Sequence, residues 1–373
     1  MRTLLAACVA ISSVLVVQGG PSTPADAACT SSNLSAAALN SIFKNPGIGR
    51  SATVPGYAGG DYQRVYPVSG GRYLWLFQDV FFSNDNDLRD SKTAAAHNAG
   101  LVQTGTCFTL VGGPYMKNYI GSKQTTPLSH WFWPMDGEMG ADGNLWVFMA
   151  EFRNPAGTGA GYGAAPVGTW VARINPTTLQ VISFGPARNA SRSLYGWSIV
   201  NDSRYSYLYG HCYRQYAHKA DSAAQFDATC MPSTYVARVP KGRFDLPPVY
   251  WTGSSWSANG ASARPVMTRG AANPMDVRYI NGKFVNVTKA DDWWGTKIHV
   301  DTAPTPMGPW TNRNSVSVPR KCTSGCGNYH ATLLPYQEPD GRMVVAISNG
   351  GKFSLWYANA FLYRVSFLNI PAP

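Results

Sequence analysis

Six carboxylates stand out in a chain whose charged residues make up only 14% of the sequence. They are Asp61, Asp79, Asp136, Glu138, Glu151 and Asp276. Carboxylates that face one another push their pKa values apart, so one can hold a proton while its neighbour stays ionised. Such a pair can cleave a glycosidic bond: one acid protonates the leaving oxygen, and the other acts as nucleophile or activates water. We take Asp61, Asp79 and Asp136 as candidate catalytic acids and the other three as catalytic or pKa-tuning reserves.

A pattern that occurs five times along the chain positions these acids. In each repeat a turn-forming pair of residues precedes a short apolar run, often rich in aromatic residues. The runs start after Gly71, Gly143, Ser203, Gly282 and Gly341. A strand-like stretch precedes each run and a strand–turn–strand follows it. The pattern predicts an all-β fold, a five-bladed β-propeller in a single domain.

The strands of each blade can be labelled A to D from the channel outward. Strand A is expected at 61–68, 131–139, 196–201, 274–280 and 329–335, and the repeated runs form strand B. Strands C and D are expected within 98–111, 169–182, 234–249, 296–310 and 361–370, so the last D strand lies near Phe367. Residues 31–43 have the only helical pattern, which Asn33 or Ser35 would cap. A sandwich or six blades are the alternatives, but a sandwich rarely shows five equal cycles.

Two positions in each blade point to the same end of the channel: the start of strand A and the end of strand B. The A starts are Asp61, Asp136, Trp197, Asp276 and His330, and the B ends are Asp79, Glu151, His211, Lys289 and Asn349. Most of these side chains are ionisable, and burying ionisable groups together is unfavourable unless they are paired or functional. The long loops that join strands B and C lie at the same end, as binding loops often do. We expect Asp61, Asp79 and Asp136 to converge there.

A second set of residues is expected to bind substrate at this end of the channel. The set is His97, Asn98, Trp133, Trp197, His211, Trp293, Trp294 and His330. A tryptophan face can stack on a sugar ring, and a histidine can orient a carboxylate. The alternatives are a core position for a strand tryptophan, a structural role for a lone histidine and a turn cap for a single aspartate. We assign no metal and no cofactor, because Asp85-Asn86-Asp87 lacks the glycine and glutamate of a calcium loop and no nucleotide motif occurs.

The first 27 residues have the pattern of a secretory signal peptide. Arg2 precedes an apolar stretch over 4–17, and Ala25-Asp26-Ala27 fits a cleavage site. We expect residues 28–373 to be a secreted propeller domain, because no apolar run is long enough to cross a membrane.

The cysteines support an extracellular location. Removal of Cys8 with the signal leaves six, and an even count in an exported protein predicts disulfides. Pairing nearest neighbours gives Cys29–Cys107, Cys212–Cys230 and Cys322–Cys326. Metal ligation by the last pair is the alternative, but it lacks a second ligand pair close by.

The net charge of +11 suggests a partner besides the substrate. A basic exported protein can adhere to anionic cell-wall polymers, although the same charge also fits a generic basic exoprotein. No Lys/Arg-rich run has nucleic-acid character, so nucleic acid is set aside as a partner. Neither a membrane nor a second copy is expected, and we take the protein as a monomer.

Several short motifs give the chain a family resemblance. They are Gly60-Asp61, LWLFQD at 74–79, His97-Asn98, WFWPMDG at 131–137, YVARVP at 235–240, GPW at 308–310 and YHATLLPY at 329–336. Together they resemble the propeller family associated with endo-D-arabinanases, which cut the D-arabinan of mycobacterial-type cell walls. The resemblance implies that Asp61 and Asp79 lie in the catalytic centre, with Asp136 as a third carboxylate. The family has Gly-Asp-Thr where this chain has Gln78-Asp79-Val80.

Three functions fit these observations. The first is a secreted glycoside hydrolase that acts on a furanose-rich polysaccharide, most directly D-arabinan. The second is a non-catalytic carbohydrate-binding or cell-wall-binding propeller, which would show aromatic and amide side chains rather than carboxylates at the channel end. The third is a propeller glycosidase that acts on L-arabinan, xylan or fructan.

Overall fold

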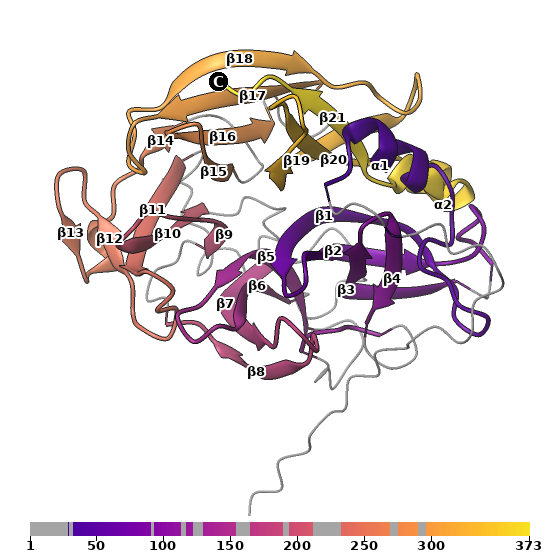
Figure 1. The fold of residues 1–373 in the computed structure, drawn as a ribbon, viewed down its shortest axis with the longest axis horizontal. Coiled ribbons are helices and arrows are strands. Elements are labelled where there is room, and N and C mark those ends of the chain that lie inside the picture. The colour runs from indigo at the N-terminus through magenta and orange to yellow at the C-terminus, as the bar shows by residue number, and fades with distance from the viewer. Residues whose placement is uncertain are drawn as a thin grey trace, which may run out of the picture.

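The computed structural model describes residues 29, 33–90, 93–112, 117–121, 130–153, 165–188, 194–211, 233–268, 275–289 and 296–373. These residues form five antiparallel sheets arranged in a ring, with β1, β5, β9, β15 and β19 on the inside (Figure 1). Neighbouring inner strands contact one another around the ring. The five-bladed β-propeller expected from the repeats is confirmed.

Four strands in sequential order make up the first, second and fourth blades. Blade 1 contains β1 (Tyr57–Val68), β2 (Arg72–Phe82), β3 (Ala94–Thr104) and β4 (Cys107–Val111). Blade 2 contains β5 (His130–Met139), β6 (Leu145–Arg153), β7 (Ala165–Ile174) and β8 (Val181–Pro186). Blade 4 contains β15 (Asp276–Ile280), β16 (Lys283–Lys289), β17 (Lys297–Ala303) and β18 (Thr311–Ser317). The outer strand β18 therefore lies beyond the 296–310 stretch in which it was expected.

The third and fifth blades depart from four strands. Blade 3 contains β9 (Leu194–Asn201), β10 (Tyr205–His211), β11 (Ser233–Pro240) and β12 (Val249–Trp251), with the short strands β13 (Trp256–Ser257) and β14 (Met267–Thr268) added. Blade 5 contains β19 (Cys326–Gln337), β20 (Met343–Gly351) and β21 (Ser366–Ile370). The expected 361–370 stretch supplies only one strand, because its first part forms the 3₁₀ helix η5 (Ala360–Tyr363). A second 3₁₀ helix, η4 (Gly260–Ser262), lies in blade 3, and the short α-helix α2 (Phe353–Ala358) precedes η5.

The apolar runs of strand B are explained by burial on both faces of each blade. Leu74 and Leu76 of β2 belong to the apolar cluster shared with blade 2. Trp75 and Phe77 belong to the cluster shared with blade 5. Alternate residues of a strand point to opposite faces of the sheet, so a strand that is covered on both faces must be apolar throughout.

The helix α1 (Ala36–Phe43) covers the last blade, where a fourth strand would otherwise lie. Ser35 caps the helix, since its hydroxyl accepts a hydrogen bond from the Ala38 amide at 3.2 Å. The buried Phe43 ring packs edge-on against the Tyr57 and Phe367 rings, at 5.7 and 5.2 Å between ring centroids. The start of the chain therefore joins blade 1 to blade 5.

Asn40 completes the exposed edge of β21. Its side-chain amide donates to the Phe367 carbonyl at 2.8 Å and accepts from the Phe367 amide at 2.9 Å. A pair of hydrogen bonds of this kind replaces the contact that a neighbouring strand would make, and it blocks the edge against other chains.

Replacing Asn40 with alanine should lower the free energy of unfolding by about 1–3 kcal/mol, because two backbone groups of Phe367 lose their partner. Urea denaturation measures this change. Asn45→Ala is the control, since Asn45 is exposed just after the same helix and its loss should change little. Equal midpoints for the two variants would contradict the role of Asn40.

Two of the expected disulfides are present. Cys29 pairs with Cys107, which ties the residue near the start of the chain to β4, and Cys322 pairs with Cys326. Cys212 and Cys230 lie outside the described residues. In the part of the chain that is described, no helix is both long and apolar enough to cross a membrane.

Candidate active site

Asp61 and Asp79 are brought together by an irregular stretch of blade 1. Asp61 lies opposite Gln78 in the β1–β2 ladder, so it is one position away from Asp79. The ladder shifts register on both sides of Asp61, and such bulges turn side chains away from their regular directions. Tyr62 and Asp79 have φ of 43° and 32°, a left-handed backbone that costs non-glycine residues about 1–2 kcal/mol each. Irregular backbone of this kind is concentrated at functional sites.

Asp79 is the accessible carboxylate of the two. Its side chain is 36% exposed. Its Oδ1 accepts a hydrogen bond from the Trp133 indole at 3.0 Å, and the His97 Nδ1 lies 2.7 Å from the same oxygen. The His97 ring stacks on Trp131 with 4.9 Å between ring centroids, which fixes its orientation. Asp79 is thereby held in one orientation while part of it stays open to solvent.

Asp61 has more enclosed surroundings. The Tyr329 hydroxyl donates to its Oδ2, while Oδ1 is buried and has no hydrogen-bond partner among the described residues. Burial raises the pKa of this carboxyl well above its ordinary value, and the nearby charge of Asp79 raises it further. Hydrogen bonds from Tyr329 and Tyr363 oppose part of this rise. The two acids therefore differ in their surroundings. The pKa of the enclosed Asp61 carboxyl is raised, whereas the Asp79 carboxylate is partly exposed and is held by the Trp133 indole and the His97 ring.

Asp136 makes its contacts in the interior of the channel rather than beside these two acids. It is fully buried, and its Oδ1 and Oδ2 accept from the backbone amides of Gly137 and Ile199 at 2.9 and 2.8 Å. The Arg278 guanidinium lies 3.5 Å from Oδ2. Each oxygen already has a partner within the fold, so Asp136 is better explained as a buried ion-pair residue than as the third catalytic acid expected from the sequence.

Asp276 belongs to the same buried ion-pair cluster. The Arg64 guanidinium lies 3.0 Å from its Oδ1 and also donates to the Trp197 carbonyl at 2.7 Å. Arg278 lies 3.8 Å from the same Oδ1. Burial raises the pKa of Asp276, whereas Arg278 and Arg64 lower it. The cluster joins strands of blades 1, 2, 3 and 4 across the channel.

Replacing Asp136 with asparagine should therefore lower the free energy of unfolding by about 3–5 kcal/mol, because Arg278 loses a buried partner. Chemical denaturation measures this change. Asp245→Asn is the matched control, since Asp245 is in an exposed pair with Arg243 at 2.8 Å and its loss should cost at most about 1 kcal/mol. Loss of turnover in a variant whose stability is unchanged would instead return Asp136 to the catalytic set.

The two glutamates expected as reserves have partners of their own in blade 2. Glu138 is near the far end of β5, where it accepts from the Met139 amide at 2.9 Å. Burial raises its pKa, which Arg278 partly lowers. Glu151 accepts a hydrogen bond from the Trp170 indole within blade 2.

Of the residues expected to bind substrate, His97 and Trp133 lie beside Asp79. Asn98 is fully buried, and its amide bonds the backbone of Ile120 and Phe132, so it joins β3 to neighbouring segments. Trp197 and His330 are also buried, which leaves neither ring open to a sugar. The side chain of His211 and the residues Trp293 and Trp294 lie outside the part of the chain that is described.

The tyrosines around Asp61 did not figure among the expected site residues. The sequence assigns no role to Tyr329, which lies in the YHATLLPY motif at 329–336, or to Tyr363. The Tyr62 ring stacks on His330 with 4.3 Å between ring centroids and lies 5.5 Å from the Tyr329 ring. Tyrosine makes up 20 residues of this chain, so no sequence pattern separates these from the others. Within the described ranges, no group of three or more His, Cys, Asp or Glu side chains could hold a metal ion.

The fold of this chain is similar to that of a solved structure. A comparison with curated proteins found no match. A solved structure from Bacteroides ovatus, provisionally described as a hydrolase, is 16% identical with a TM-score of 0.68, over 89% of this chain and 88% of that one. A GH43 β-xylosidase/α-arabinofuranosidase from a compost microbial metagenome is 14% identical with a TM-score of 0.47, over 88% of this chain and 94% of that one.

The first of these likenesses establishes a shared fold. A family profile also matches residues 51–372, which is nearly the whole propeller. The chain therefore belongs to the family described as domain of unknown function (DUF5005).

Proposed function

We propose that this protein is a secreted glycoside hydrolase that cleaves a furanose-rich polysaccharide. The observation that carries the proposal is the pair formed by Asp61 and Asp79, two neighbouring carboxyls in contrasting surroundings. Glycoside hydrolysis requires one protonated and one ionised carboxyl on either side of the scissile bond. Pairs of titratable groups whose environments separate their pKa values mark the acid and the base of many active sites.

In this proposal each acid has one role. Asp61, whose pKa is raised, is the acid that gives its proton to the glycosidic oxygen as the C–O bond breaks. Asp79 either attacks the anomeric carbon or takes a proton from the water that attacks it. His97 and Trp133 hold Asp79 in place, and the exposed part of the Trp133 ring offers an apolar face to a sugar.

The substrate proposed is D-arabinan of mycobacterial-type arabinogalactan, cut within the chain. The support is the series of motifs shared with the endo-D-arabinanase-associated propellers, which includes both Asp61 and Asp79. A net charge of +11 supports a second contact with anionic cell-wall polymers, and the pattern of residues 1–27 supports export. The enzyme is proposed to act as a monomer.

A panel of polysaccharides tests the proposal: mycobacterial arabinogalactan, isolated D-arabinan, L-arabinan, xylan and fructan, with the products resolved by size. We expect a ladder of oligosaccharides from the first two and none from the others. Cleavage of L-arabinan, xylan or fructan instead would support glycoside hydrolysis but contradict D-arabinan as the substrate. Retention of polysaccharide without any cleavage would support a binding module.

A further inference from the structure

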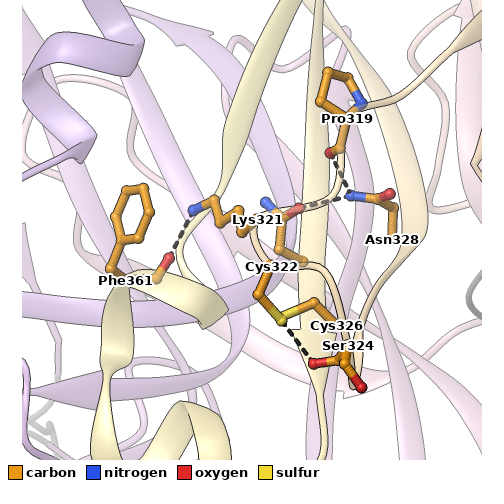
Figure 2. The surroundings of a disulfide bond; sticks show 8 residues. Pro319, Lys321, Cys322, Ser324, Cys326, Asn328 and Phe361 are labelled. Carbon is orange, nitrogen blue, oxygen red and sulfur yellow. Dashed lines mark hydrogen bonds between the residues drawn. A yellow bond between two sulfur atoms is a disulfide. The ribbon is translucent and has the colours of Figure 1, made fainter.

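The loop between blades 4 and 5 places a half-buried lysine next to the segment that carries Tyr363. The Lys321 ammonium donates to the carbonyls of Phe361 and Arg364, at 2.7 and 2.6 Å. It also lies 4.3 Å from the centroid of the Phe361 ring. Figure 2 shows Lys321 pointing from its loop toward Phe361. The two carbonyls lie on either side of Tyr363, so Lys321 fixes the backbone before and after that residue.

Tyr363 is the last residue of η5, and it packs directly on the strand that carries Asp61. A Cβ added to Gly59 of β1 would lie only 3.2 Å from its ring. The ring is also stacked on Trp356 with 4.5 Å between centroids. The position of the Tyr363 hydroxyl relative to Asp61 therefore depends on how η5 is held against β1.

The same loop also holds Tyr329. The Cys322–Cys326 disulfide ties the residue after Lys321 to the first residue of β19. The Asn328 amide then donates to the Asn349 side chain at 2.7 Å, which fixes β19 to β20. Tyr329 follows directly, and its hydroxyl donates to Asp61. One short segment thus positions both tyrosines.

We propose that Lys321 is a positioning residue of this site: it holds Tyr363, and through its loop Tyr329, in hydrogen-bonding position against Asp61. The expected effect on catalysis rests on the proposed function. The structural role of Lys321 does not depend on which substrate is cleaved. Burial and the neighbouring Arg364 charge lower the pKa of the Lys321 ammonium well below its ordinary value. A half-buried lysine next to another cation is destabilising by itself. The two hydrogen bonds to the Phe361 and Arg364 carbonyls are therefore its contribution to the site.

The direction of the effect follows from the groups that face Asp61. These are Asp79 from β2, Tyr329 from β19, Tyr363 from η5 and Tyr57 from β1 itself. Asp79 raises the pKa of Asp61, and the hydroxyls of Tyr329 and Tyr363 lower it. If Tyr329 and Tyr363 were held less firmly, their hydrogen bonds to Asp61 would weaken. The pKa of Asp61 would then rise further, and Asp61 would become a weaker proton donor.

The test compares Lys321→Met, which keeps the length of the side chain and removes its donors, with Lys352→Met. Lys352 is exposed beside the same loop, where its amide donates to the Gly325 carbonyl at 3.0 Å whatever its side chain. Carbon-13 NMR of the Asp61 carboxyl follows its titration in wild type and both variants. We expect the Asp61 titration to move up by about one pH unit in Lys321→Met and to stay in place in Lys352→Met.

Kinetics give the second readout. We expect kcat of Lys321→Met to fall about tenfold with KM nearly unchanged, and the alkaline limb of the pH profile to move up with the Asp61 titration. Melting curves establish that the variant is folded. If Lys321→Met does not fold, Lys321→Gln, which keeps one N–H donor group at the site, is measured in its place.

The outcomes separate the two proposals. A folded variant with an unmoved Asp61 titration and pH profile would overturn the role of Lys321, whatever the enzyme cleaves. A wild-type protein that cleaves no polysaccharide would overturn the proposed function, and the NMR titration would still decide the role of Lys321.

Discussion

Replacing Asp79 with asparagine is expected to reduce turnover on D-arabinan by at least about 10²-fold while the melting temperature stays within error of wild type. A nucleophile or general base typically contributes ~10²–10⁴-fold to the rate. The asparagine oxygen can still accept from the Trp133 indole, and the side chain is partly exposed, so little stability is lost. Initial rates of oligosaccharide release and thermal melting give the two readouts.

Asp87→Asn is the matched control for this variant. Asp87 is 44% exposed in the loop that follows β2, where its carboxylate pairs with Arg89. Its loss removes the same charge from the same blade without touching the Asp61–Asp79 pair, so turnover should stay within twofold of wild type. Equal turnover in Asp79→Asn, Asp87→Asn and wild type would remove Asp79 from the catalytic centre.

The sequence was sufficient to predict the propeller because strand B of every blade must be buried on both faces. Strand B is covered on both faces, so alternate residues such as Trp75 and Leu76 are buried against different blades and the run becomes apolar throughout. This requirement is local and recurs five times. The closure of the ring depends on residues far apart in the sequence: Asn40 hydrogen-bonds Phe367 near the other end of the chain. The repeated pattern does not predict such a contact.

The site was predictable only where its residues come from adjacent strands. Asp61 and Asp79 are neighbours because β1 and β2 form one hairpin in which Asp61 lies opposite Gln78, one residue from Asp79. Asp136 was expected beside them because it was counted among the strand A starts, although the strand itself was expected at 131–139 and β5 indeed begins at His130. Six residues along a strand carry a side chain about 20 Å, so Asp136 lies well inside the channel with Arg278.

The surroundings that distinguish the two acids could not be predicted, because they depend on blade 5. Tyr329 of β19 lies 268 residues from Asp61 along the chain, and Tyr363 of η5 lies further still. Whether a carboxyl is protonated depends on burial and on such distant hydroxyls, not on its own strand. Sequence alone therefore left the proton donor unassigned, and the three-dimensional arrangement favours Asp61.

Replacing Asp61 with asparagine should abolish most turnover, again by at least about 10²-fold, and should also stabilise the protein at neutral pH. The second effect follows from the raised pKa of the folded carboxyl, whose ordinary value is 3.8. Between 3.8 and the folded pKa, the native state keeps a proton that the unfolded chain has released. Wild-type stability therefore falls as pH rises through this window, whereas an asparagine does not titrate.

The measurement is thermal melting of wild type and Asp61→Asn from pH 3 to pH 8, beside turnover at each pH. We expect the two melting temperatures to converge at the acid end and the variant to be the more stable at the neutral end. The variant's amide can still accept from Tyr329, so the tyrosine contact does not obscure the comparison. A variant that loses stability in parallel with the wild type as pH rises would show that Asp61 is ionised in the native state, and the role of proton donor would then pass to another carboxyl.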